Sequence, residues 1–114
     1  MTSFRIVTLG CKVNQYESAW LREALCDEGW KWAGKGHSDV TVVNTCIVTQ
    51  TASRQSRQEI RKAIRRSPGG IVAAVGCYAQ VFPDELLEID GVSLIVGNSS
   101  KRAFVGILKD AIDG

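Results

Sequence analysis

Residues 71–77 read Ile-Val-Ala-Ala-Val-Gly-Cys, a short apolar run that ends in a glycine and a cysteine. Two earlier stretches follow the same pattern, since residues 4–11 read FRIVTLGC and residues 40–46 read VTVVNTC. Runs of this length, rich in β-branched residues and closed by turn residues, are typical of strands buried on both faces. Because a helical pattern follows each run, the sequence predicts parallel strands connected by helices.

The first helix is expected shortly after the first strand. Asn14 has the side chain of an N-cap, and Glu17 follows it at the spacing of a capping box. Gly29 is expected to end this helix near residue 28. Its predicted buried face consists of Trp20, Ala24 and Leu25.

The second and third helices follow the cysteines of the second and third strands. Thr49 or Thr51 is expected to cap a helix that reaches about residue 66, where Ser-Pro-Gly-Gly at residues 67–70 stops it. Pro83 is expected to open a short helix, because proline suits the first helical position.

The rest of the chain continues this alternation. Further strands are expected at residues 30–33, as a short edge strand, and at residues 92–96. Ser99 or Ser100 caps a last helix whose apolar residues recur at helical spacing, namely Phe104, Ile107, Leu108 and Ala111. The whole pattern predicts an α/β fold with three layers: a mainly parallel sheet of about four to five strands with helices on both faces, as in flavodoxin-like or Rossmann-like folds.

The composition is that of one ordinary globular domain. The chain has 114 residues, of which 45% are hydrophobic and 23% charged, and its formal net charge is +2. No internal linker divides it, so residues 1–114 are interpreted as a single domain. The apolar runs are far shorter than the roughly 20 residues of a membrane helix and the N-terminus lacks signal-peptide features, so we expect a cytoplasmic protein with no membrane partner. Its four cysteines are then expected to be reduced thiols or metal ligands.

Three of these cysteines, Cys11, Cys46 and Cys77, directly follow the three apolar strands. In an open parallel sheet the loops after the strands gather at one edge, so these thiols are expected to converge there. The helices that follow point their N-termini at the same place, where free N–H groups and the helix dipole stabilise thiolates. Such an arrangement favours a soft metal ion or an anionic cluster.

Other interpretations of the cysteines stay open at this point. Each could be a small buried residue in a tight turn, although three at equivalent positions make that explanation the weaker one. A zinc site of three thiols would lack the closely spaced cysteine pairs and the fourth ligand of structural zinc sites. Cys26, near the end of the first helix, is interpreted as a packing residue, and His37 as a solvated loop residue.

The strings around the three cysteines resemble the N-terminal domain of the radical S-adenosylmethionine (SAM) methylthiotransferases. They read TLGCKVNQYES at residues 8–18, VVNTCIVTQTASRQSRQEIRK at residues 42–62, AAVGCYAQVFPDEL at residues 73–86 and DGVSLIVGN at residues 90–98. The resemblance covers essentially the whole chain. It implies an auxiliary [4Fe–4S] cluster held by Cys11, Cys46 and Cys77, with one iron left open to an exogenous sulfur.

The first string also resembles one subfamily. GCKVNQYE at residues 10–17 is most similar to the enzymes that methylthiolate N6-threonylcarbamoyladenosine next to the anticodon of tRNA. Enzymes acting on isopentenyladenosine more often carry GCQMN, and those acting on a ribosomal protein GCPKN. Another tRNA base or a ribosomal protein therefore remains an alternative substrate.

Full enzymes of this family continue into a radical SAM domain, which binds S-adenosyl-L-methionine and a second [4Fe–4S] cluster, and into a small RNA-binding domain. Neither is present in these 114 residues. The resemblance therefore implies a fragment of a transferase that binds its cluster, works with the radical SAM domain of its parent chain, and is inactive alone.

Basic and amide residues near the cysteines complete the candidates. Arg54 and Arg57, near the cysteine end of the basic second helix, are candidates for contact with tRNA phosphates, with a solvated helix face as the alternative. Asn14 and Asn44 flank the cysteine loops, where helix capping and turn hydrogen bonds are favoured over contacts with cluster sulfurs. Two other functions compete with the enzyme: a non-catalytic metal or cluster-binding module, and a flavodoxin-like binder of a small ligand with incidental cysteines.

Overall fold

Five parallel strands form the sheet: β1 (Ser3–Thr8), β2 (Lys31–Trp32), β3 (Val40–Thr45), β4 (Ile71–Gly76) and β5 (Leu94–Ile95). The computed structural model describes residues 2–9, 12–33, 38–46, 50–96 and 101–113, without the side chains of residues 12–14, 50–52, 77, 101–102 and 113. The strands lie in the order β2-β1-β3-β4-β5. This confirms the predicted α/β fold, and the order is that of flavodoxin-like sheets.

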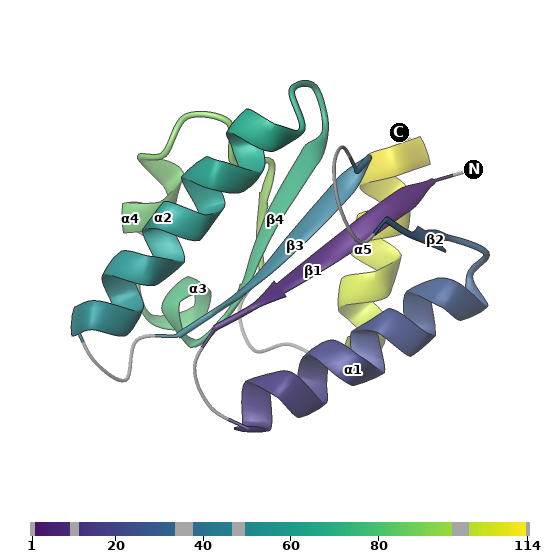
Figure 1. Cartoon of the computed structure of the whole chain (residues 1–114), viewed down its shortest axis with the longest axis horizontal. Coiled ribbons are helices and arrows are strands. Elements are labelled where there is room, and N and C mark those ends of the chain that lie inside the picture. Colours follow the sequence, from purple (N-terminus) through teal and green to yellow (C-terminus); the bar gives the residue numbers. More distant parts are fainter. Residues whose placement is uncertain (1, 10–11, 34–37, 47–49, 97–100, 114) are drawn as a thin grey trace.

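The helices of the described chain cover both faces of the sheet: α1 (Lys12–Asp27), α2 (Gln50–Arg66), α3 (Cys77–Val81), α4 (Pro83–Leu87) and α5 (Lys101–Asp113). Figure 1 shows α2, α3 and α4 on one side of the sheet and α1 and α5 on the other. Leu25 and Leu108 belong to the core under α1 and α5, whereas Ile60, Tyr78 and Leu86 belong to the core under α2, α3 and α4. The predicted three layers are therefore present.

β3 illustrates why the strands read as continuous apolar runs. All six of its residues are buried, because the strand lies inside the sheet and both of its faces are covered. Val42 packs in the core beneath α1 and α5, and its neighbour Val43 packs in the core beneath α2. None of the described helices combines the length and apolar character that crossing a membrane requires.

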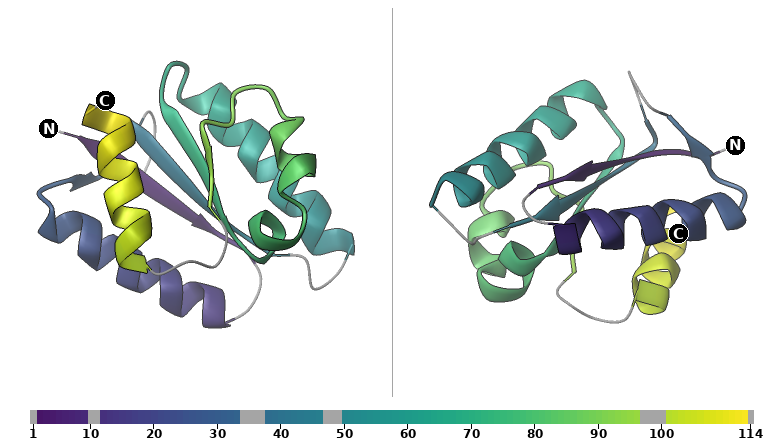
Figure 2. Two further views of the ribbon diagram at one scale, coloured as in Figure 1. Left: turned by 180° about the vertical axis from the view of Figure 1, so that it is seen from behind. Right: turned by 60° about the horizontal axis from the view of Figure 1, so that its bottom comes forward.

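The direction of winding reverses between β1 and β3. The crossover from β1 runs through α1 on one face, and the crossover from β3 runs through α2 on the opposite face. Their carboxyl ends therefore flank a topological switch point, the place where open α/β sheets bind ligands. In Figures 1 and 2 the ends of β1, β3 and β4 lie close together beside α3.

The start and the phase of α1 differ from the prediction. The helix begins at Lys12, so Asn14 lies inside its first turn and is not the N-cap. Of its predicted buried face, Leu25 is buried and Ala24 packs against the same core, which confirms these two residues. Trp20 is 37% exposed, and Leu21 is buried in its place. Packing against the sheet decides which side of α1 is buried. The helix also starts before the position that the local capping signal indicated.

Other local predictions were also wrong. Cys26 is exposed, because it lies next to the sheet-facing Leu25 and points about 100° away around the helix. Ile107 is 38% exposed, and Val105 faces the core in its place. Thr51 lies inside α2, which begins at Gln50, and the five-residue helix α3 was not foreseen. Thr49, His37, Ser99 and Ser100 lie outside the described residues.

Candidate functional site

The carboxyl edge of the sheet brings two cysteine positions next to each other. Thr45 of β3 pairs with Gly76 of β4 in the last register of these neighbouring strands. Cys46 and Cys77 are the residues that directly follow this pair. On the other side of β3, Thr8 pairs with Asn44, and Cys11 comes three residues after Thr8. Cys11 itself lies outside the described residues.

Gly76 makes the close approach of β3 and β4 possible. Its backbone has φ +93° and ψ −163°, a combination open essentially to glycine alone. A Cβ atom at this position would lie 2.6 Å from the Thr45 carbonyl oxygen and 2.7 Å from Asn44 Oδ1. The turn into Cys77 therefore requires the absence of a side chain at residue 76.

Cys46 is held by a serine of α2. Its side chain is buried and forms no disulfide. Ser56 Oγ accepts a hydrogen bond from the Cys46 N–H at 3.1 Å and donates one to the Cys46 carbonyl at 3.1 Å. Both backbone polar groups of Cys46 thus depend on one fully buried hydroxyl.

Cys77 is the first residue of α3, and its side chain is not described. The next residue, Tyr78, is buried and accepts a hydrogen bond from Arg57 Nη1 at 2.6 Å. Its hydroxyl donates to Glu85 Oε2 at 2.6 Å. Burial and the bond to the Glu85 carboxylate raise the pKa of Tyr78 against the opposing effect of Arg57, so the phenol stays a neutral donor.

Asn44 belongs to a polar network on the opposite face of the sheet. It is fully buried, and its Nδ2 donates to Ser18 Oγ of α1 at 3.3 Å. Thr8 Oγ1 donates to the same serine oxygen at 2.6 Å. The network ties β1, β3 and α1 together beside the strand ends. The side chain of Asn14 is not described.

The donor set suits a soft metal or an iron–sulfur cluster better than a hard cation. Thiolates select such metals, and the two cysteine positions flank a turn that leaves no room for a Cβ. Among the side chains that the structure describes, which exclude those of Cys11 and Cys77, no three His, Cys, Asp or Glu residues form a metal-binding group.

Residues 3–97 match the model of the family described as "Uncharacterized protein family UPF0004". The chain belongs to this family. It is 39% identical over 109 residues to the threonylcarbamoyladenosine tRNA methylthiotransferase MtaB of Bacillus subtilis, covering 95% of this chain and 24% of the relative. The corresponding protein of Aquifex aeolicus is 42% identical over 107 residues, covering 93% and 26%. The resemblance drawn from the cysteine strings is thereby confirmed.

A second kind of methylthiolating enzyme is also related to this UPF0004 domain. The tRNA-2-methylthio-N(6)-dimethylallyladenosine synthase of Chlorobium phaeovibrioides is 33% identical over 117 residues, covering 98% of this chain and 26% of the relative. The chain thus spans about a quarter of the length of the relatives it matches.

The two arginines predicted to contact tRNA differ in their surroundings. Arg54 is exposed on α2, whereas Arg57 is half-buried and donates to Tyr78. Helix α2 of this UPF0004 domain carries six basic residues and one acidic residue, while the rest of the chain carries eight basic and eleven acidic residues. Among its basic residues, those that are exposed are Arg54, Arg61, Lys62, Arg65 and Arg66.

Sequence reasoning missed Ser56, Tyr78 and Glu85. A signal for Ser56 was present, because Ser56, Ile60 and Ala63 recur at i, i+4 and i+7 on the buried face of α2. A small polar residue in an apolar stripe indicates a buried hydrogen-bond partner. No comparable signal marked Glu85, since its partner depends on how α3 and α4 fold back.

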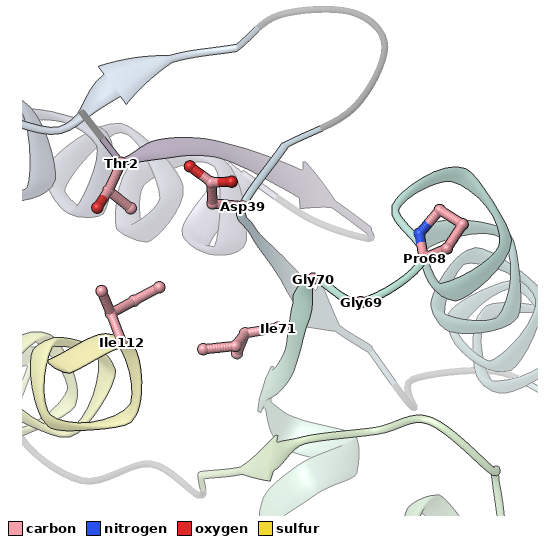
Figure 3. Close-up of a pocket in the computed structure, with 7 residues that line it drawn as sticks. All are labelled: Thr2, Asp39, Pro68, Gly69, Gly70, Ile71 and Ile112. Carbon is pink, nitrogen blue, oxygen red and sulfur yellow. The ribbon is translucent and has the colours of Figure 1, made fainter. Parts of the chain in front are cut away.

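A hollow of about 530 Å³ lies at the opposite, amino edge of the UPF0004 domain (Figure 3). Its lining comprises Thr2, Asp39, Pro68, Gly69, Gly70, Ile71 and Ile112. The lining contains one ionisable side chain, Asp39, whose Oδ2 accepts the Ser3 N–H at 2.9 Å. None of the described residues that line this hollow carries a thiol or a basic side chain, so these residues offer no ligand for a cluster.

Proposed function

We propose that this chain is the auxiliary [4Fe–4S] cluster domain of a tRNA methylthiotransferase that acts on N6-threonylcarbamoyladenosine next to the anticodon. The observation that carries the proposal is the pairing of Thr45 with Gly76, because Cys46 and Cys77 directly follow these residues on adjacent strands. Cys11 is proposed as the third ligand, after the strand on the other side of β3. The names of the relatives support the enzyme class.

The residues of this chain would hold and shield such a cluster. A cubane cluster with three protein thiolates has one iron position open, and it supplies a binding site for the sulfur to be transferred. Cys46 is only 3% exposed, so its thiolate would be kept from water. Asn44 anchors the end of β3 from the other face, and Asn14 is proposed near the Cys11 loop.

The parent enzyme is proposed to be cytoplasmic and to supply the remaining parts. These are a radical SAM domain with S-adenosyl-L-methionine and a second [4Fe–4S] cluster, together with an RNA-binding domain. Residues 1–114 are proposed as one domain that binds its cluster and does not complete the reaction alone.

The direct test is the iron and acid-labile sulfide content after anaerobic reconstitution. The unsubstituted chain is expected to hold about four of each. Replacing Cys11, Cys46 or Cys77 by serine one at a time should abolish the cluster. Cys26→Ser is the matched control, because that thiol is exposed on the outer surface of α1 and should be dispensable. A full cluster in any of the three variants would remove that cysteine from the site.

Contact with tRNA is proposed for the exposed end of α2 that lies nearest the cysteines. Arg54 offers an exposed guanidinium to a phosphate, whereas Arg57 would have to share its bond to Tyr78 with the phosphate. In the parent enzyme, Arg54→Glu should weaken tRNA binding at every salt concentration and reduce the slope of log K against log salt by about one. Lys31→Glu, on the exposed edge strand, is the control for the change of charge. Equal effects of the two variants would exclude a specific role for Arg54.

The identity of the modified base is the part of the proposal for which the relatives offer an alternative. The two relatives named above for threonylcarbamoyladenosine are 39% and 42% identical to this chain, and the one named for dimethylallyladenosine is 33% identical. The parent enzyme should therefore methylthiolate a tRNA with the first base and leave a tRNA with the second unchanged. Product mass spectra of the two tRNAs decide between them.

A further inference from the structure

Ser56 holds the main chain of Cys46 from both sides. Its hydroxyl is the partner of the N–H and of the carbonyl of the same residue, each at 3.1 Å. Two bonds to one residue restrict the rotation of that residue more than bonds to two different residues would. Ser56 is fully buried, so water does not compete for these bonds.

The neighbouring residue on α2 reaches the other cysteine. Arg57 Nη1 donates to Tyr78 Oη at 2.6 Å, and Tyr78 directly follows Cys77. The Tyr78 hydroxyl in turn donates a hydrogen bond to Glu85 Oε2 of α4, also at 2.6 Å. Helix α3 has only five residues and no side-chain hydrogen bond at its N-cap. The start of α3 is oriented by the bonds that its second residue, Tyr78, makes to Arg57 of α2 and Glu85 of α4.

We propose that Ser56 and the Arg57–Tyr78–Glu85 chain are positioning residues that fix the distance between the Cys46 and Cys77 main chains. Residues 56 and 57 are adjacent on one rigid helix, with a rise of about 1.5 Å between them. The segments after β3 and β4 are thus held by hydrogen bonds from the same turn of α2. This inference rests on the proposed function, because it assigns the two bonds a purpose in holding the cluster.

A purely structural role predicts something different. Ser67, just past the other end of α2, is also buried, and its Oγ accepts the Ser38 N–H at 3.1 Å. Loss of the Ser67 hydroxyl removes one buried bond to the segment before β3, and loss of the Ser56 hydroxyl removes two buried bonds to the residue after β3. If these bonds serve only the fold, Ser56→Ala and Ser67→Ala should both lower the denaturant midpoint and leave the cluster unchanged. If Ser56 positions a ligand, only its loss should change the cluster.

The experiment compares Ser56→Ala, Tyr78→Phe and Ser67→Ala in the reconstituted chain. The rate at which a chelator removes iron, the electron paramagnetic resonance spectrum of the reduced cluster and the denaturant midpoint are measured for each. Ser56→Ala and Tyr78→Phe should lose iron about tenfold faster than the unsubstituted chain and show a shifted spectrum, as expected when groups that orient ligands are removed. Ser67→Ala should lower the denaturant midpoint but keep the rate and the spectrum.

The outcomes separate this inference from the proposed function. If the unsubstituted chain holds no cysteine-dependent cluster, both fall together. If it does, and Ser56→Ala and Tyr78→Phe release iron at the rate of Ser67→Ala with an unchanged spectrum, the positioning role alone is overturned. Tyr78→Phe keeps the buried ring, so it tests the positioning role even if Ser56→Ala does not fold.

Discussion

The two edges of the sheet place their side-chain hydrogen bonds differently. At the amino edge, Ser3 and Asp39 exchange reciprocal bonds of 2.9 and 3.0 Å, and Ser67 accepts the N–H of Ser38. These bonds join neighbouring loops to one another and close the edge. At the carboxyl edge, the bonds of Ser56 and Tyr78 end on or beside residues that carry thiols. Under the positioning role proposed above, the bonds of the carboxyl edge orient the cysteine segments, whereas those of the amino edge serve the fold alone.

Replacing one glycine at each edge by alanine should give the largest difference in the free energy of unfolding. Gly76→Ala should destabilise the fold by about 3 kcal/mol or more, because a Cβ would overlap the Thr45 carbonyl oxygen at a backbone angle of φ +93°. Gly69→Ala, at φ +80° with nothing within 4 Å, should cost only about 1 kcal/mol. Denaturant unfolding of both variants gives the two values. Equal losses would mean that the strand ends are less tightly packed than the structure has them.

Binding of the cluster should slow hydrogen exchange more at the carboxyl edge than at the amino edge. The amides of Cys46 and Ser38 both donate to serine hydroxyls, that of Ser56 inside α2 and that of Ser67 directly after it. A cofactor present at a hundred times its dissociation constant stabilises the folded state by about 2.7 kcal/mol, so exchange at the Cys46 amide should slow about 100-fold. The Ser38 amide should slow less, because local opening at the amino edge releases no ligand. Hydrogen exchange with and without the cluster tests this, and equal protection would contradict a site confined to the carboxyl edge.

A moderate effect is expected from the polar network under α1. Ser18→Ala removes the acceptor of the bonds from Thr8 and Asn44 in a buried site, which should cost about 2 kcal/mol. Ser3→Ala at the half-buried amino edge should cost about 1 kcal/mol, because water can replace the lost hydroxyl. Thermal unfolding of the two variants ranks them. The reverse order would show that the network contributes less than its burial implies.

The smallest effect is expected away from both edges. Lys109 Nζ lies 2.8 Å from Glu28 Oε2 on the surface between α5 and α1, with the side chains 45% and 37% exposed. Exposed pairs of this kind contribute less than about 1 kcal/mol and are screened by salt. Lys109→Ala should therefore shift the unfolding midpoint slightly at low salt and hardly at all at high salt. A loss that persists in high salt would point to packing by the lysine stem.

The element order and the three apolar strands were predictable, because local pattern decides them. Residues 40–45 hold three valines and two threonines, and this β-branched composition indicated a buried parallel strand. The short edge strand near Lys31 and the end of α1 before Gly29 were also found from local signals. What local signals did not decide was the phase of α1, where Leu21 and not Trp20 faces the sheet.

The sequence by itself determined that three cysteines follow three strands, and that this chain is related to methylthiotransferases. Only the tertiary structure decided which residues stand beside them. Ser56 reaches Cys46 across ten positions of chain, and Arg57 reaches Tyr78 across twenty-one. The physical reason is that the position of a strand end follows from the residue pattern along the chain. A hydrogen bond from a helix to a strand end forms only after the sheet and its helices have packed together.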